Sequence, residues 1–141
     1  MTFDSLMWAG AESQYDGHLL LKRFREIPGT FPRSKYPQPI NIFWEMIETD
    51  ENGLPTENEF RRLETFEDRL VNAIERDAQS ILVAALSCDG EKEFVFYTTD
   101  VSGFMERLTN MPQEKERYPI TIQKSDDPAW SYFEAVVPKA A

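Results

Sequence analysis

The sequence is short of cysteine, histidine and basic charge. Its 141 residues contain one Cys (Cys88) and one His (His18), and 25 Asp and Glu face 15 Lys and Arg, which gives a formal net charge of −10. A single cysteine excludes an internal disulfide framework, and the lack of a Cys/His cluster argues against a zinc site. The excess of acid repels phosphate, so we expect neither nucleic acid nor a membrane surface as a partner. We expect no cofactor either.

The sequence also lacks a long hydrophobic run. No segment approaches the roughly 20 apolar residues of a membrane-spanning helix. The first residues read MTFDSLMWAGAES and lack the basic and apolar regions of a signal peptide. We therefore expect a cytoplasmic location, where Cys88 is a small core thiol in its free form. His18 has no catalytic neighbours in the sequence, and we expect an exposed histidine at a strand end.

What the sequence does contain is enough apolar material for a folded core. Hydrophobic residues make up 41% of the chain and aromatic residues 13%, so disorder is not expected. Domains cluster at roughly 100–150 residues, and we expect residues 1–141 to form a single domain. Its expected parts are a hairpin extension at 5–26, a core at 38–125 and an aromatic tail at 126–137.

An Asp-Gly pair near the start of the chain predicts a tight β-hairpin. Asp16 and Gly17 suit a type I′ turn because both residue types tolerate the positive φ angles that this turn requires. A two-residue turn sets the register of the hairpin and places Trp8 opposite Arg25. The two strands are expected at 6–15 and 18–25.

The rest of the chain predicts an alternation of strands and helices. Thr56, followed three residues later by Glu59, forms a capping box that begins the long helix. In order, the patterns indicate a strand at 40–47, a helix from 56 to about 77, strands at 80–88 and 91–98 around a second Asp-Gly turn, a short helix that starts at 100, and a strand at 118–124. The apolar face of the long helix is expected to comprise Phe60, Leu63, Leu70, Val71 and Ile74.

This order of elements indicates an α+β fold. After the first hairpin, the order β-α-β-β-α-β matches the split β-α-β, or ferredoxin-like, arrangement, an antiparallel sheet with two helices on one face. The added hairpin either extends this sheet or covers its other side.

The second hairpin predicts two apolar faces on that sheet. Regular pairing places one set of side chains on one face, namely Ile81, Val83, Ala85, Phe94 and Phe96. It places a second set on the opposite face, namely Leu82, Ala84, Leu86, Val95 and Tyr97. Helices cover only one face, so the second set needs a cover, which the tail aromatics, the first hairpin or another chain would provide.

Charge is distributed unevenly along the chain. Residues 22–36, which we call the basic loop, carry a net charge of +4, from Lys22, Arg23, Arg25, Arg33 and Lys35 against Glu26. Residues 45–59 carry six acids and no base. The two segments either form solvated surfaces that attract each other or orient a partner.

Glu67 is the residue of the long helix that departs from its apolar pattern. It lies near the middle of the expected apolar face, where an unpaired carboxylate is costly to bury. It is either an acid with a raised pKa or half of a binding site, or else a structural carboxylate paired with an Arg, Tyr or Trp.

Several short phrases, in their order along the chain, resemble a known family. They are GLPT, FEDRL, FVFYTTD, RYPITI and DDPAWSYF. Together they resemble an uncharacterised bacterial domain-of-unknown-function family over roughly residues 17–133. The final phrase is also similar to the DPxWxxY ending of the B-type regulator of ribonuclease E, whose domain is sometimes fused to this family. That regulator is a ferredoxin-like protein that binds and inhibits a ribonuclease, so the resemblance implies a ferredoxin-like fold and regulatory binding without catalysis.

These observations together favour a non-enzymatic, protein-binding or regulatory domain. A protein partner or a second copy is expected on the open sheet face that holds Tyr97. The loop and the tail are expected to add Arg33, Lys35, Tyr36, Trp130, Tyr132 and Phe133 to this surface. The alternative for the tail is a hydrophobic clasp that closes the domain.

Two other function classes remain open at this point. One is a small ligand-binding domain or enzyme that uses Glu67 and the basic loop. The other is an acidic nuclease inhibitor, which requires the acids of residues 45–59 to lie along one exposed ridge.

Overall fold

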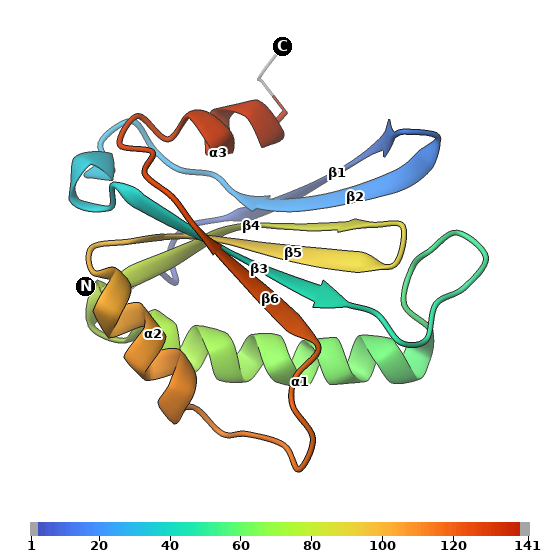
Figure 1. The fold of residues 1–141 in the computed structure, drawn as a ribbon. Helices are drawn as coiled ribbons and strands as arrows, with labels where there is room; N and C mark the ends of the chain where they lie inside the picture. The colour runs from blue at the N-terminus through green and yellow to red at the C-terminus, as the bar shows by residue number, and fades with distance from the viewer. Residues whose placement is uncertain (1–2, 139–141) are drawn as a thin grey trace.

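The computed structural model describes residues 3–138, which form a six-stranded sheet with helices on both faces (Figure 1). The strands are β1 (Trp8–Tyr15), β2 (His18–Arg25), β3 (Gln38–Glu45), β4 (Ser80–Cys88), β5 (Glu91–Thr98) and β6 (Ile120–Lys124). The helices are α1 (Glu57–Ile74), α2 (Val101–Asn110) and α3 (Ser131–Val136), with short 3-10 turns η1 (Arg33–Lys35) and η2 (Arg76–Ala78). No helix in this part of the chain is long and apolar enough to cross a membrane.

The strands follow the order β1-β2-β4-β5-β3-β6, and every neighbouring pair is antiparallel. The predicted order of strands and helices is therefore confirmed as far as β6, whereas the helix α3 in the tail was not predicted. The first hairpin extends the sheet instead of covering it. The predicted hairpin register is confirmed as well, because Trp8 pairs with Arg25. Asp16 and Gly17 adopt φ angles of 50° and 80°, as a type I′ turn requires.

The helices α1 and α2 cover one face of the sheet (Figure 1). Thr56 caps α1 as predicted, because its hydroxyl accepts a hydrogen bond from the Glu59 amide at 3.4 Å. The helix ends at Ile74, three residues earlier than expected, because Asp77 has a φ of 60° that a helix cannot accommodate. The buried side chains of α1 are Glu59, Leu63, Phe66, Leu70 and Ile74.

The predicted apolar face of α1 is wrong at one position. Phe60 is 52% exposed, whereas Phe66 has no exposed surface and contacts Trp44 and Phe94. The buried side of α1 begins instead at Glu59, whose carboxylate accepts a hydrogen bond from the Trp44 indole at 2.7 Å. The buried residues of α1 follow the regular helical repeat, and Phe60 lies about 100° around the helix from Glu59, outside this set.

The predicted faces of β4 are wrong in the first half of the strand. A β-bulge lies between Leu82 and Ala84. Ile81 and Val83 therefore belong to the face opposite the helices, and Leu82 packs against the helices. Beside the bulge, the Glu75 carboxylate accepts a hydrogen bond from the Leu82 amide at 2.8 Å.

The sheet face opposite α1 and α2 holds a second core. Tyr97 and Val95 of β5 point into it, and α3 with the segment before it lies on top (Figure 1). Tail aromatics are one of the covers expected from the sequence, and they fill this role. The buried members of the second core are Phe3, Tyr36, Ala78, Ile81, Val83, Ala84, Val95, Tyr97, Trp130 and Phe133.

Candidate functional site

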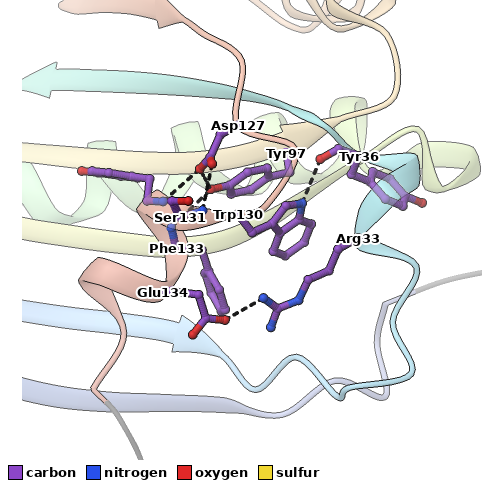
Figure 2. Close-up of polar contacts among 9 residues, drawn as sticks. Arg33, Tyr36, Tyr97, Asp127, Trp130, Ser131, Phe133 and Glu134 are labelled. Carbon is purple, nitrogen blue, oxygen red and sulfur yellow. Dashed lines mark hydrogen bonds and ion pairs between the residues drawn. The ribbon is translucent and has the colours of Figure 1, made fainter.

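The tail closes onto the sheet through Trp130 (Figure 2). The indole has no exposed surface and stacks on the Tyr97 ring, with centroids 4.2 Å apart and planes 19° apart. Its Nε1 donates a hydrogen bond to the Tyr36 carbonyl at 2.9 Å. Trp130 has a φ of 58°, a left-handed conformation that is unusual for a bulky residue. This backbone strain is accepted because the turn delivers the indole into the second core.

Asp127 organises the turn that carries Trp130. Its carboxylate accepts hydrogen bonds from the amides of Ser131 and Tyr132 at 2.8 and 2.9 Å and from the Tyr97 hydroxyl at 2.8 Å. Burial opposes ionisation of this carboxyl, but the hydrogen bonds from Tyr132, Ser131 and Tyr97 outweigh burial and lower the pKa of Asp127. Burial, together with the hydrogen bond to Asp127, raises the pKa of Tyr97. The carboxylate therefore caps α3 and ties it to β5.

The basic loop contributes Arg33 and Tyr36 to the same closure. The Arg33 guanidinium lies 5.1 Å from the centroid of the Trp130 ring and pairs with Glu134 at 2.6 Å, as Figure 2 shows. The Tyr36 hydroxyl donates to the Ala78 carbonyl at 2.6 Å, and only 3% of the residue is exposed. Lys35, by contrast, is exposed.

These contacts correct the expectation of an open apolar surface. Tyr36, Tyr97, Trp130 and Phe133 are each 4% exposed or less, because the tail packs on the sheet as the hydrophobic clasp. Of the expected tail residues, Tyr132 stays 36% exposed. We call the closure formed by residues 127–134 with Arg33, Tyr36 and Tyr97 the clasp.

Glu67 lies apart from the clasp, on the helix side of the sheet. Its Oε1 is 2.5 Å from Arg23 Nη2 and 3.7 Å from Lys92 Nζ. The ion pair with Arg23 fits the structural role considered for this carboxylate. Burial lowers the pKa of Lys92; the Glu67 carboxylate opposes this decrease, and the Arg23 guanidinium adds to it. A hollow of about 370 Å³ lies beside the three residues.

Two buried polar pairs were not predicted. The Glu59 carboxylate, which the sequence assigned to a capping box, accepts from the Trp44 indole and also pairs with Arg62. Arg25 pairs with Glu75 at 2.5 Å, and both side chains are 11% exposed or less. For the Arg25–Glu75 pair, the sequence gives one signal, a basic residue at the end of an apolar strand. Glu75 itself could not be identified because it is 50 residues away along the chain.

The half of the sheet face that the clasp leaves uncovered is acidic. Two hollows of about 640 and 470 Å³ share Phe43 as a lining residue. Within residues 3–138, the side chains that line them include no Lys or Arg. Their acids are Glu45, Asp89, Glu91, Glu93, Asp126 and Asp127. We call these two joined hollows the acidic trough.

The acids of the trough lie close enough to repel one another. Glu45 and Glu91 are directly opposite each other on β3 and β5. Burial, with the added repulsion of Glu93 and Glu45, raises the pKa of Glu91. Glu93 accepts hydrogen bonds from Asn41 Nδ2 at 2.7 Å and the Tyr132 hydroxyl at 2.6 Å. Burial and this bond raise the pKa of Tyr132.

Three of the six acids of residues 45–59 are buried or paired with an arginine. Glu59 is fully buried, and Glu48 pairs with Arg62 at 3.2 Å. Glu57 pairs with Arg61 at 2.5 Å.

The remaining candidate chemistry is sparse. His18 lies 3.5 Å from Asp89 at the exposed tip of the sheet. Burial, followed by the charges of Asp89 and Glu91, raises the pKa of the half-buried Cys88 thiol, which makes it a poor nucleophile. In residues 3–138, no three His, Cys, Asp or Glu side chains gather where they could hold a metal ion.

Comparison with known proteins places the chain in a family. Residues 7–136 match a family of unknown function (DUF695), and the chain belongs to that family. No curated protein and no solved structure matches the chain significantly.

Proposed function

We propose that this DUF695 chain is a non-enzymatic protein-binding domain that docks a basic segment of a partner protein in the acidic trough. The observation that carries the proposal is the composition of the trough, which joins six acids and no Lys or Arg around Phe43. Like charges held close together repel one another and raise the free energy of the unbound protein, and a cationic segment relieves this repulsion.

The aromatic side chains of the trough suit the same ligand. Phe43 is half-buried where the two hollows meet, and Tyr132 is 36% exposed at the end beside the clasp. The guanidinium and ammonium groups of Arg and Lys stack favourably on aromatic faces. A segment with alternating basic residues thus finds carboxylates and rings along one path.

Charge also selects between the two partners expected from the sequence. Two copies that met through this face would bring two acidic troughs together, and like charges across an interface are unfavourable. A different, basic protein is the better fit to this surface. The clasp then has a supporting role, because Tyr132 and Asp127 position one end of the trough.

We further propose that the core has the ferredoxin-like split β-α-β arrangement. The strand order β4-β5-β3-β6, with α1 and α2 on one face, supports this assignment. The similarity of the tail to the DPxWxxY ending of the B-type regulator of ribonuclease E supports a regulatory role for the binding. The resemblance does not extend to naming a ribonuclease as the partner.

The test measures binding of a fluorescein-labelled peptide of alternating Arg and Gly by fluorescence anisotropy. The double variant Glu45→Gln/Glu91→Gln removes two opposed carboxylates of the trough. Both carboxylates are exposed, and an exposed ion pair contributes about 0.2–1 kcal/mol, so we expect binding to be roughly 2- to 30-fold weaker.

The matched control changes the same net charge elsewhere. Glu12 of β1 and Glu106 of α2 are both exposed and line neither hollow. The variant Glu12→Gln/Glu106→Gln should retain the affinity of the parent chain. Equal losses in the two double variants would reduce the effect to net charge and overturn the proposal, as would a parent chain that does not bind the peptide.

A further inference from the structure

A second hollow lies on the opposite face of the sheet, between α1 and the strands β2, β4 and β5. It measures about 370 Å³, which is within the usual size of small-molecule sites. Leu21, Ser87 and Lys92 are neighbours in one row across the three strands and form its floor. Arg23, Pro55, Phe60, Leu63 and Glu67 also line it.

The charges at this hollow do not balance. One carboxylate, Glu67, pairs with two cations, Arg23 and Lys92. The side chains of Glu67 and Lys92 are each only 17% exposed, whereas that of Arg23 is 42% exposed. Glu64 also lines the hollow but is exposed to solvent, and Lys22 belongs to the opposite face by the alternation of β2. The Arg23–Glu67–Lys92 cluster thus holds two cations and one carboxylate, and Lys92 is the cation that is shielded from water.

The walls of the hollow are apolar. Leu21, Leu63 and Pro55 line it, and Phe60 stands at its rim with 52% of its surface exposed. Phe60 takes no part in the core below α1. A large exposed aromatic next to a semi-buried cation is the arrangement expected around a ligand that has one apolar and one anionic part.

We propose that this hollow binds a small monoanionic molecule, a carboxylate on an apolar chain, with its charge at Lys92 and Arg23 and its chain against Phe60 and Leu63. A single negative charge neutralises the excess charge of the cluster, whereas the two charges of a phosphate monoester exceed it. The site lies on the helix side of the sheet, so it is independent of the acidic trough and of the function proposed for the trough.

The experiment uses the environment-sensitive dye 8-anilinonaphthalene-1-sulfonate, an apolar monoanion, and its displacement by molecules with the same alkyl chain. Octanoate should displace the dye about tenfold better than octanol or octylamine, because only octanoate supplies the negative charge. Octyl phosphate should rank below octanoate. Displacement by octanol at the same concentration as octanoate would overturn the proposal.

Variants assign the binding to named residues. Lys92→Met keeps an unbranched chain and removes the charge, and octanoate affinity should fall about tenfold or more. The control Lys124→Met changes an exposed lysine on β6 and should have no effect. Unchanged affinity in Lys92→Met would contradict the site.

Two further variants keep the proposal testable if Lys92→Met does not fold. Glu67→Gln removes the carboxylate that competes for both cations, and octanoate should bind more tightly to this variant. Phe60→Ala alters an exposed side chain, so the fold should persist while octanoate affinity falls several-fold. Unchanged affinity in both variants would mean that the Arg23–Glu67–Lys92 cluster is structural only.

Discussion

On one face of the sheet, α1 supplies 18 residues and α2 supplies 10 over a continuous core. On the other face, α3 supplies six residues, a length at which an isolated helix is unstable in water. The first face is covered by two long amphipathic helices, which bury a large apolar area against the sheet. The second is closed by specific contacts, namely the Trp130–Tyr97 stack, the Asp127 hydrogen bonds and the Arg33–Glu134 pair.

This difference between the two faces predicts which part of the structure unfolds locally. The core under α1 extends along the helix from Leu63 to Ile74, whereas the clasp rests on a few specific contacts of Asp127, Trp130 and Glu134. Regions that depend on few contacts open with a lower free energy than the global unfolding free energy. The clasp is therefore the part of the described chain that we expect to open first.

The largest effect is expected in the helix-covered core. Phe66→Ala removes a fully buried ring that contacts Trp44, Phe94 and Tyr118. The substitution leaves a closed cavity, so urea denaturation should show a loss of about 3–5 kcal/mol in the free energy of unfolding. The control Phe60→Ala, in the same helix, should lose less than about 1 kcal/mol. Similar losses in both variants would contradict the placement of Phe66 on the buried side of α1.

The next effect tests whether the clasp is a separate unit. Trp130→Ala should cost less than Phe66→Ala, near the lower end of the range of about 3–5 kcal/mol, because α3 can detach and leave no closed cavity. Hydrogen exchange should then accelerate in α3 and in the Tyr97 region while the α1 amides keep their protection. Trp130→Phe keeps an aromatic ring, so its free energy of unfolding should lie between those of the parent and of Trp130→Ala. Uniform acceleration across α1 and α3 would show one cooperative unit and remove the distinction between the faces.

The smallest effect concerns the acid that caps α3. Asp127→Asn should cost about 0.5–2 kcal/mol at neutral pH, the usual range for a capping side chain. The pKa of Asp127 is lowered in the folded protein, so the ionised carboxylate stabilises the fold above the ordinary Asp pKa of about 3.9. This contribution is lost as the pH falls through the folded pKa. Urea denaturation over a pH series should therefore show the difference between parent and variant shrinking below about pH 4.

The neighbouring residue provides the control for that measurement. Asp126 is exposed and its Oδ1 accepts only a long hydrogen bond, at 3.3 Å, from Gln38. Asp126→Asn should change the free energy of unfolding by less than about 0.5 kcal/mol at every pH. A pH dependence that is the same in the two variants would contradict the assignment of the cap to Asp127.

Local signals in the sequence predicted most of the elements. Asp16-Gly17 set the register of its hairpin, because the turn geometry admits one pairing, and Thr56 marked the start of α1. The faces of β4 were predicted wrongly because regular pairing was assumed, whereas a bulge lies between Leu82 and Ala84. The exposure of Phe60 was missed because an apolar pattern omits the polar Glu59, which is buried against Trp44.

The candidate sites divide in the same way. Glu67 was identified by its position on an apolar helix face, but its two cations come from β2 and β5 and became neighbours only on folding. The trough was not predicted as a set, since its acids come from two strands, one turn and the segment before α3, and do not follow one another in the chain.

By itself, the sequence determined the order of strands and helices, the two tight turns and the need for a cover on the second sheet face. These depend on propensity and periodicity, which act between residues close in the chain. Only the tertiary structure decided that the tail provides the cover, that one cation beside Glu67 is in excess and that acids collect around Phe43. Each of these depends on which distant side chains meet, and burial and charge act through space whatever the separation along the chain.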